Sequence, residues 1–159
     1  MNNLQPTDQR QILLFTLDEP RYALNLSTVE RVVRAAEIIP LPKTPEVVLG
    51  VINIEGEITL VVDIRQRLHL PARELDLDDQ FILARTARRR VALVVDAVVG
   101  TRELEDGERV PAVQVLPGAE YIHSVAKLDG NLVLICDLDQ FLSFDEEEMV
   151  DEALPRETA

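Results

Sequence analysis

The sequence predicts an all-β fold made of two similar halves, and two observations lead to this prediction. Apolar residues make up 47% of the chain and aromatic residues only 4%, so the core must come from Val, Ile and Leu, which favour strands. In addition, residues 51–68 align without a gap with residues 125–142 at a constant offset of 74 (125 − 51 = 74). One small supersecondary unit has therefore been used twice. The result suggests a surface that binds partners, with no cleft of reactive groups.

The first half begins with two predicted strands. Residues 11–17 form an apolar run, and residues 21–26 resume it after an Asp-Glu-Pro turn. Ser27 and Glu30 have the spacing of a capping box, which predicts a single helical turn at this point. Three prolines between residues 40 and 45 then mark a loop.

Each copy of the repeat is predicted to be a β-hairpin. Glu55-Gly56 and Asp129-Gly130 separate two apolar runs, and the glycine supplies the positive φ that a two-residue turn needs. The second strands, residues 58–62 and 132–136, are apolar on both faces. A strand with one wet face would alternate, so we expect both faces to be covered, as in two small barrels packed against each other.

The remaining segments follow the same duplication. Residues 65–70 suit a short helix, residues 71–79 link the halves, and the second half begins at Gln80. The Arg-Val-Ala-Leu run at 90–93 echoes Arg-Tyr-Ala-Leu at 21–24 with an offset of 69 (90 − 21 = 69), which extends the repeat.

The C-terminal end is acidic and turns helical after Asp137. Residues 145–152 carry six carboxylates, and two interpretations are open. The segment either packs as a helix with Met149 and Val150 on a barrel, or it is a repelling tail that keeps the protein in solution.

Composition excludes several classes of partner. The chain has 159 residues, 16 basic and 29 acidic, with a formal net charge of −13, whereas a nucleic-acid surface is normally basic. An anionic membrane is disfavoured for the same reason. The single cysteine allows no internal disulfide. The N-terminus lacks the apolar core of a signal peptide, and no run approaches the ~20 apolar residues of a membrane span, so we expect a cytoplasmic protein.

The sequence offers no catalytic residue, metal site or cofactor site. Phosphate loops, dinucleotide fingerprints, cysteine pairs at zinc spacing and His-Glu-x-x-His are all absent from it. His69 and His123 have no neighbours spaced as an oriented partner and nucleophile. Cys136 lies inside an apolar run, where a free cysteine usually behaves as a small hydrophobic residue.

Two charged motifs allow two interpretations each. Asp63 and Asp137 end equivalent strands, and either they cap the helical turns that follow or they form a carboxylate pair for acid–base chemistry. The run Arg88-Arg-Arg90 either attracts an acidic partner or is a solvated hairpin turn.

The order of motifs along the chain indicates a family resemblance. The segments that carry it are residues 15–17, 22–26, Val29, 44–45, 50–56, 62–65, 94–98, 121–130 and 134–142. In this order they closely resemble the CheW family of chemotaxis coupling proteins, over roughly residues 10–145. The resemblance implies two intertwined five-stranded SH3-like β-barrels with short helices and a C-terminal helix. It also implies a single domain of two barrel subdomains at 10–145, followed by an acidic segment at 146–159.

The function that the resemblance implies is that of a non-enzymatic adaptor. Such a protein couples the cytoplasmic tips of methyl-accepting chemoreceptors to the regulatory domain of a CheA-type histidine kinase. It is cytoplasmic and is recruited to membrane-associated receptor arrays without inserting into the membrane. The output served is either flagellar or another, such as pilus-driven motility.

The resemblance also suggests which residues contact the partners. A helical receptor tip would lie in a groove between the barrels as an amphipathic helix in an apolar slot. The residues expected to line this receptor-binding groove are Val29, Arg31, Ile54, Glu55, Gly56 and Val98. The residues expected to contact the kinase are Ile38, Ile39 and Thr44, although Ile38 and Ile39 suit a barrel core equally well.

Two positions depart from the family pattern. The family's hairpin motif typically reads Asn-Leu-Arg-Gly, whereas this chain has Glu55 in place of the arginine. The family commonly has a glutamate at the position of Arg31, so both charges are inverted together. We interpret this as an ion pair of reversed polarity that affects the choice of partner. The alternative is two unrelated solvated charges.

A different class of protein remains a rival at this point. It is a small β-barrel enzyme or ligand-binding protein with an unidentified pocket, which would require a deep cavity with convergent polar groups.

Overall fold

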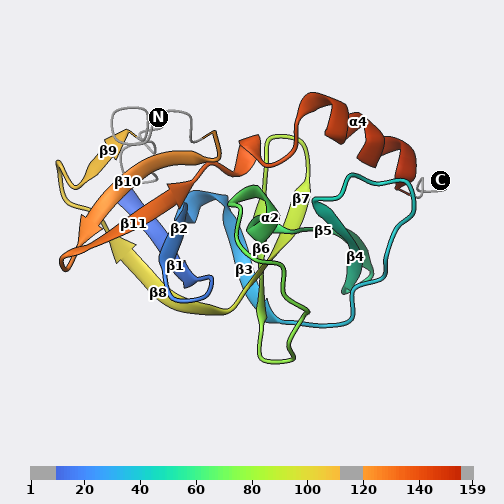
Figure 1. Cartoon of the computed structure of the whole chain (residues 1–159), viewed down its shortest axis with the longest axis horizontal. Coiled ribbons are helices and arrows are strands. Elements are labelled where there is room, and N and C mark those ends of the chain that lie inside the picture. Colours follow the sequence, from blue (N-terminus) through green and yellow to red (C-terminus); the bar gives the residue numbers. More distant parts are fainter. Residues whose placement is uncertain (1–9, 112–119, 155–159) are drawn as a thin grey trace.

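A computed structural model describes residues 10–111 and 120–154 of the chain. The chain folds almost entirely into strands, as Figure 1 shows. The strands are β1 (Gln11–Thr16), β2 (Arg21–Asn25), β3 (Val29–Arg34), β4 (Val48–Ile54), β5 (Glu57–Val62), β6 (Gln80–Arg85), β7 (Arg90–Val95), β8 (Ala97–Glu103), β9 (Arg109–Pro111), β10 (Ile122–Leu128) and β11 (Asn131–Cys136). The helices are η1 (Leu26–Thr28), α2 (Ile64–Arg67), η2 (Leu138–Gln140) and α4 (Phe144–Ala153).

The strands form two sheets, which correspond to two SH3-like barrels. Barrel A has the order β8-β1-β2-β11-β10-β9, and barrel B has the order β3-β6-β7-β5-β4. The predicted all-β fold with short helices and a C-terminal helix is confirmed. Barrel A has one strand more than the five expected, because the three-residue strand β9 adds an edge beside β10.

The two halves of the chain are intertwined, and the repeat explains how. Strand β6 copies β1 at the offset of 69 (80 − 11 = 69), and β10 copies β4 at the offset of 74 (122 − 48 = 74). Barrel A takes β1 and β2 from the first half and β8, β9, β10 and β11 from the second. Barrel B takes β6 and β7 from the second half and β3, β4 and β5 from the first. Neither half therefore contains a complete barrel.

The strand register shows the same duplication. Each barrel has one parallel pair, β5 with β7 in barrel B and β11 with β2 in barrel A. Leu60 lies opposite Val91 in barrel B, and Leu134 lies opposite Tyr22 in barrel A. These are equivalent pairs, because 60 + 74 = 134 and 22 + 69 = 91. A parallel pair needs a long connection, and here residues 63–89 connect β5 to β7 and residues 26–130 connect β2 to β11.

Both predicted hairpin turns are present. Glu55 and Gly56 have φ of 53° and 89°, and Asp129 and Gly130 have φ of 52° and 83°. Positive φ at both central residues is the signature of the type I′ turn, whose twist matches that of the flanking strands.

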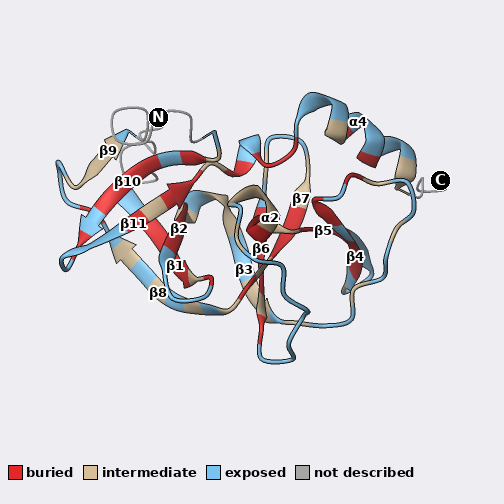
Figure 2. Ribbon diagram, viewed as in Figure 1, coloured by how far each residue is buried: buried red, intermediate tan, exposed pale blue. Residues whose placement is uncertain are grey.

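The strands after these turns bury both faces, except beside the turn itself. Leu60, Val61 and Val62 are buried, as predicted, but Ile58 is 50% exposed and its repeat equivalent Leu132 is 61% exposed. The reason is the register, since β7 covers β5 only from Leu60 onward and β2 reaches β11 only at Leu134. Figure 2 shows the exposed ends of these strands.

The buried faces divide into three clusters. One belongs to barrel A alone and includes Ile12 and Leu14, and another belongs to barrel B alone and includes Phe81 and Leu83. The largest is shared by both barrels and includes Phe15 among its members. Strands β1, β5, β6 and β11 therefore turn one face into their own barrel and the other toward the second barrel, as the sequence predicted for β5 and β11.

Polar contacts join the barrels at equivalent places. The buried Arg65 of α2 pairs with Asp18 at 3.0 Å and with Asp96 at 2.9 Å. The equivalent of Arg65 is Asp139 (65 + 74 = 139), which accepts a 2.8 Å hydrogen bond from the backbone N–H of Ala87, the equivalent of Asp18 (18 + 69 = 87). Burial would raise the pKa of Asp96, but hydrogen bonds from Arg65 and Arg73 hold it below its usual value. The helical turn that follows the last strand of each half therefore contacts the first hairpin turn of the same half, and this contact crosses from one barrel to the other.

The predicted caps are only partly correct. Asp63 accepts hydrogen bonds from the backbone of Arg65 and Gln66, but Asp137 caps nothing with its side chain. A helical turn, η1, is present before β3, but without the capping box, because the Glu30 carboxylate pairs with Arg85 and Arg90 instead.

Helix α4 settles the two interpretations of the acidic end and of the arginine run. Val150 is fully buried, so the helix packs on the protein as expected, although Met149 is 42% exposed. Arg89 pairs with Glu147 at 2.9 Å and also with Asp151. The arginine run therefore binds acidic side chains and is not simply a solvated turn. Its acidic partner is the chain's own C-terminal helix. The expected boundary at residue 146 falls inside α4.

We predict that the chain, cut within residues 71–79, gives two fragments that fold only together, because neither barrel is complete in one fragment. Each fragment alone should lack a cooperative melting transition, and mixing the two should restore the native circular dichroism spectrum. Folding of either fragment by itself would show that the barrels can form from consecutive strands.

Candidate functional site

The first candidate surface is the open seam of barrel B, between its two edge strands β3 and β4. Arg31 lies on β3 and Glu55 in the turn after β4, with the Arg31 Nη2 and Glu55 Oε1 atoms 2.9 Å apart. The hypothesised ion pair is therefore present, and it joins the two edges of the sheet. The side chains are 45% and 76% exposed, so the pair contributes only ~0–1 kcal/mol to stability.

A β-bulge in β3 shapes this seam. Val29 lies opposite Ala84 and Arg31 opposite Leu83, which leaves Glu30 as the extra residue. Glu30 pairs with Arg85 at 3.0 Å and with Arg90 at 3.3 Å. Burial is the largest single influence on Glu30 and opposes its ionisation, but the hydrogen bonds and positive charges of Arg85 and Arg90 together lower its pKa. Glu30 was not among the residues predicted for this site, because its spacing from Ser27 suggested a helix cap.

Barrel A has an equivalent seam. Asp129, the repeat equivalent of Glu55 (55 + 74 = 129), pairs with Arg102 of β8 at 3.3 Å. Strand β8 also has a bulge, at Val99, the equivalent of Glu30 (30 + 69 = 99). Val99 is 48% exposed. The two seams thus share an arginine–carboxylate bridge but differ at the bulge, where one has a carboxylate and the other an exposed valine.

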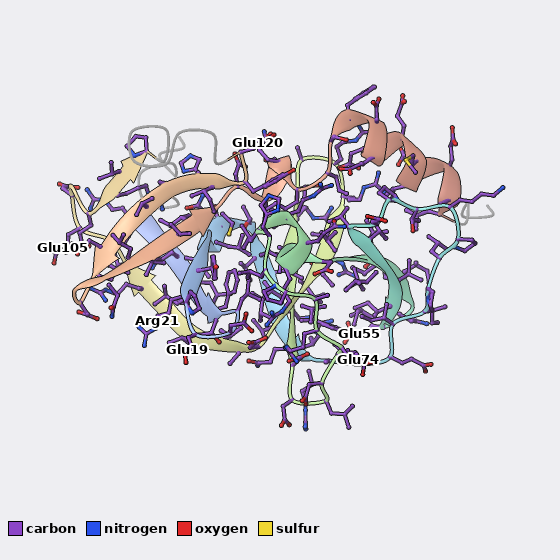
Figure 3. The ribbon with its side chains drawn as sticks, in the orientation of Figure 1. Glu19, Arg21, Glu55, Glu74, Glu105 and Glu120 are labelled. Atoms are coloured by element: carbon purple, nitrogen blue, oxygen red, sulfur yellow. The ribbon has the colours of Figure 1, made fainter. Side chains whose placement is uncertain are left out.

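The apolar residues expected in the receptor-binding groove lie beside these seams. Val29 and Val98 are half-buried against the cluster shared by both barrels, and Ile54 is half-buried against the barrel B cluster. Gly56 is exposed in the turn beside Glu55. Figure 3 shows Glu55 at the end of barrel B away from α4. None of the six residues lines either of the two pockets of 270 and 460 Å³ described below.

The second candidate surface is a pocket of about 270 Å³ beneath the linker between the halves. Its apolar lining is Ile38, Leu49, Leu75 and Val94. Ile38 is half-buried against the barrel B cluster, whereas Ile39 is 56% exposed. Of these, Leu49 and Leu75 were not predicted. Leu75 is an apolar residue between charged neighbours, which was an available signal, whereas Leu49 lies within an apolar run that gave none.

The segment that carries Ile38 and Ile39 is held on β4. The backbone of Ile39 exchanges two 2.9 Å hydrogen bonds with Val51. The Thr44 hydroxyl donates to the Leu41 carbonyl at 3.0 Å, so Thr44 stabilises the loop. Gly50 makes this contact possible, because a Cβ atom there would lie 2.2 Å from the Ile39 carbonyl oxygen.

The charged groups around this pocket are largely paired with one another. Arg73 Nη2 lies 2.8 Å from Asp79 Oδ1, and the hydrogen bond that it donates to this carboxylate raises the pKa of Arg73. Arg65 is held by Asp18 and Asp96. The pocket therefore offers mainly apolar contact area. Such a pocket is suited to binding an apolar side chain of a partner and poorly suited to catalysis.

The candidate reactive residues have ordinary surroundings. His123 is exposed on β10, with Nδ1 3.2 Å from the Ser124 hydroxyl. Burial raises the pKa of the Cys136 thiol to about 12, consistent with a small hydrophobic residue. Within residues 10–111 and 120–154, no three His, Cys, Asp or Glu side chains are grouped as metal ligands. In the same ranges no helix is both long and apolar enough to span a membrane.

Comparisons with known proteins point in one direction. The family model described as "CheW-like domain" matches residues 11–146. The chain is 26% identical over 142 residues to chemotaxis protein CheW of Treponema pallidum, covering 86% of this chain and 84% of that protein. It is 28% identical over 132 residues to CheW of Thermotoga maritima, covering 83% and 87%. The crystal structure of the scaffolding protein TtCheW from Thermoanaerobacter tengcongensis superposes with a TM-score of 0.80 at 27% identity, over 89% of this chain and 98% of that one.

We predict that Gly50→Ala destabilises the protein by more than about 2 kcal/mol, because the new methyl group would collide with the Ile39 carbonyl. Gly100→Ala is the matched control, since Gly100 has nearly the same φ (149° against 148°) and no atom within 4 Å of the added Cβ. Urea unfolding of both variants measures the difference. Equal losses would attribute the effect to backbone strain alone.

Proposed function

This chain belongs to the CheW-like family, since the family model matches residues 11–146, and on that premise we propose how it works. The protein is a non-enzymatic adaptor of a chemosensory system, and it couples chemoreceptors to a histidine kinase. The single observation that carries this function is the family match over most of the chain. The rival class, an enzyme or ligand-binding barrel, is not favoured, because the lining charges of the 270 Å³ pocket are largely paired.

We propose that the cytoplasmic tip of a methyl-accepting chemoreceptor binds beside the seams, where the two barrels meet. Val29, Val98 and Ile54 supply half-buried apolar contacts there. Arg31 and Glu55 form the polar edge, and Gly56 allows the close turn beside it. Weak contacts suffice in an array, because neighbouring contacts act at high effective concentration.

The reversed polarity of Arg31 and Glu55 is proposed to set partner choice. Their bridge is exposed and contributes little to folding, so it is free to be read by a partner. A receptor tip or kinase matched to the opposite polarity would meet like charges, which can cost several kcal/mol. The protein would thus serve its own receptors and kinase while avoiding those of a parallel system.

The kinase contact is proposed to be the surface around the 270 Å³ pocket. Ile39 is exposed on it, Ile38 lines it and Thr44 stabilises the loop behind it. Leu49 and Leu75 add apolar area on the same surface. The regulatory domain of a CheA-type kinase would insert an apolar side chain here.

The working unit is proposed to be a single domain of two barrel subdomains over residues 10–145, and the acidic segment 146–159 that follows begins within α4, which packs on this domain through Val150. The shared apolar cluster supports treating the two barrels as one unit. The protein would be cytoplasmic and join membrane-associated arrays only through its partners.

We expect Ile54→Ala to weaken capture of receptor tips several-fold while the kinase regulatory domain is still retained. Ile54 is half-buried, so the loss of stability should stay below the ~2–5 kcal/mol of a fully buried site. Leu132→Ala, at an exposed position of barrel A, is the control and should leave capture unchanged. If receptor and kinase binding disappear together with the folded state, Ile54 belongs to the core and not to the contact.

We expect the double variant Arg31→Glu, Glu55→Arg to shift preference, by about tenfold, toward receptors and kinases of systems with the ordinary polarity. Competition pull-down with partners from both kinds of system measures the ratio. The control is Arg102→Asp with Asp129→Arg, which reverses the arginine–carboxylate bridge at the seam of barrel A. An unchanged ratio in the first variant would end the specificity hypothesis.

A further inference from the structure

Helix α4 is held rigidly on the protein. The Ser143 hydroxyl accepts a 3.1 Å hydrogen bond from the Glu146 N–H, and the Glu146 carboxylate accepts one of 2.9 Å from the Ser143 N–H. This is a reciprocal capping box. Val150, on the inner face of the helix, is fully buried.

Three acidic residues of α4 are used to attach it. Glu147, which is 6% exposed, accepts from Arg89 at 2.9 Å. Asp151 pairs with both Arg88 and Arg89, and the hydrogen bond from Arg89 lowers its pKa. Glu146 pairs with Arg67 of α2. The helix is therefore positioned from both sides.

The other three acidic residues of α4 point away from the protein. Asp145, Glu148 and Glu152 are exposed, and no ion pair reaches them from the described part of the chain. Spacings of three and four residues place them on one stripe of the helix. Phe144, 68% exposed, lies on one side of this acidic stripe, and Met149, 42% exposed, lies on the other.

A pocket of about 460 Å³ adjoins the Met149 side of the helix. Its walls include Pro45, Val47 and Tyr121 as well as Met149, with Glu46 among the polar residues lining it. Pro45 and Val47 are themselves buried, so this part of the pocket is fixed. The remaining polar residues of its lining are Gln66, Arg67, His69 and Glu146, and Arg67 is paired with Glu146. Apolar side chains rimmed by polar groups are typical of a surface that contacts another protein.

We propose that the outer face of α4, together with this pocket, binds a basic amphipathic helix of another protein. Lysine or arginine side chains at helical spacing would meet the acidic stripe, and an apolar side chain would enter the pocket beside Met149. The net charge of −13 disfavours a second copy of this chain, and it equally disfavours an anionic membrane. Because α4 lies at the opposite end of barrel B from Glu55, both surfaces can be occupied together (Figure 3).

The test uses the whole chain and a synthetic peptide about five helical turns long, with Leu at helical spacing and Lys elsewhere. Fluorescence anisotropy at low salt measures its binding. We expect Glu148→Lys with Glu152→Lys to weaken binding about tenfold. Glu103→Lys with Glu105→Lys, two exposed positions on barrel A, makes the same change in net charge and should change binding less than about twofold.

Apolar variants and a second peptide complete the test. Met149→Ser should weaken binding, whereas Leu132→Ser, at another exposed apolar position, should not. A peptide with Glu in place of Lys should not bind. Equal losses in the two charge-reversed variants would mean that general charge attraction is responsible, and would overturn the proposal. The proposal would also be overturned if Met149→Ser left binding of the lysine peptide unchanged. Absence of any binding by the lysine peptide would overturn it as well.

Discussion

The exchange of strands between the two halves of the chain is the constraint on which the rest of the structure depends. Each barrel is completed by a parallel contact with the other half, Leu60 with Val91 in one and Leu134 with Tyr22 in the other. The exchange forces the barrels together, buries a common apolar cluster between them and leaves β3 and β8 as free edges. The seams at which a partner can bind therefore follow directly from how the barrels close.

Duplication gave the two barrels the same frame, and later divergence changed their surfaces. The turn residues and the bulges recur at equivalent positions, whereas the seam bridges Arg31–Glu55 and Arg102–Asp129 share only the position of the carboxylate, because the equivalent of Arg31 is Gly100 (31 + 69 = 100). Because these bridges are exposed, their polarity can change with little effect on stability. The bulge positions differ more, with Glu30 in one barrel and Val99 in the other. An adaptor can acquire different contacts in this way without altering its core.

Electrostatics in this acidic protein are organised by pairing. Most arginines of the described residues form ion pairs within the molecule. Arg65, for example, joins the barrels, and Arg89 attaches α4. What remains on the surface is an excess of carboxylates, and on α4 these are held in a fixed array. Preorganisation of this kind lowers the entropy lost on binding. The same helix thus contributes to folding with one face and presents charge with the other.

The sequence by itself determined what depends on neighbouring residues. The offset of 74 is visible in the sequence itself. Short-range chemistry predicted the turns at Glu55-Gly56 and Asp129-Gly130 and the cap at Asp63. The family resemblance predicted the barrels. Tertiary structure decided which distant groups meet. It paired Arg89 with Glu147, moved Glu30 from a helix cap to a bulge, exposed Ile58 and placed Leu75 over a pocket. The physical reason is that charged and apolar side chains interact most strongly with whatever groups lie next to them in space. The strand exchange determines which groups those are.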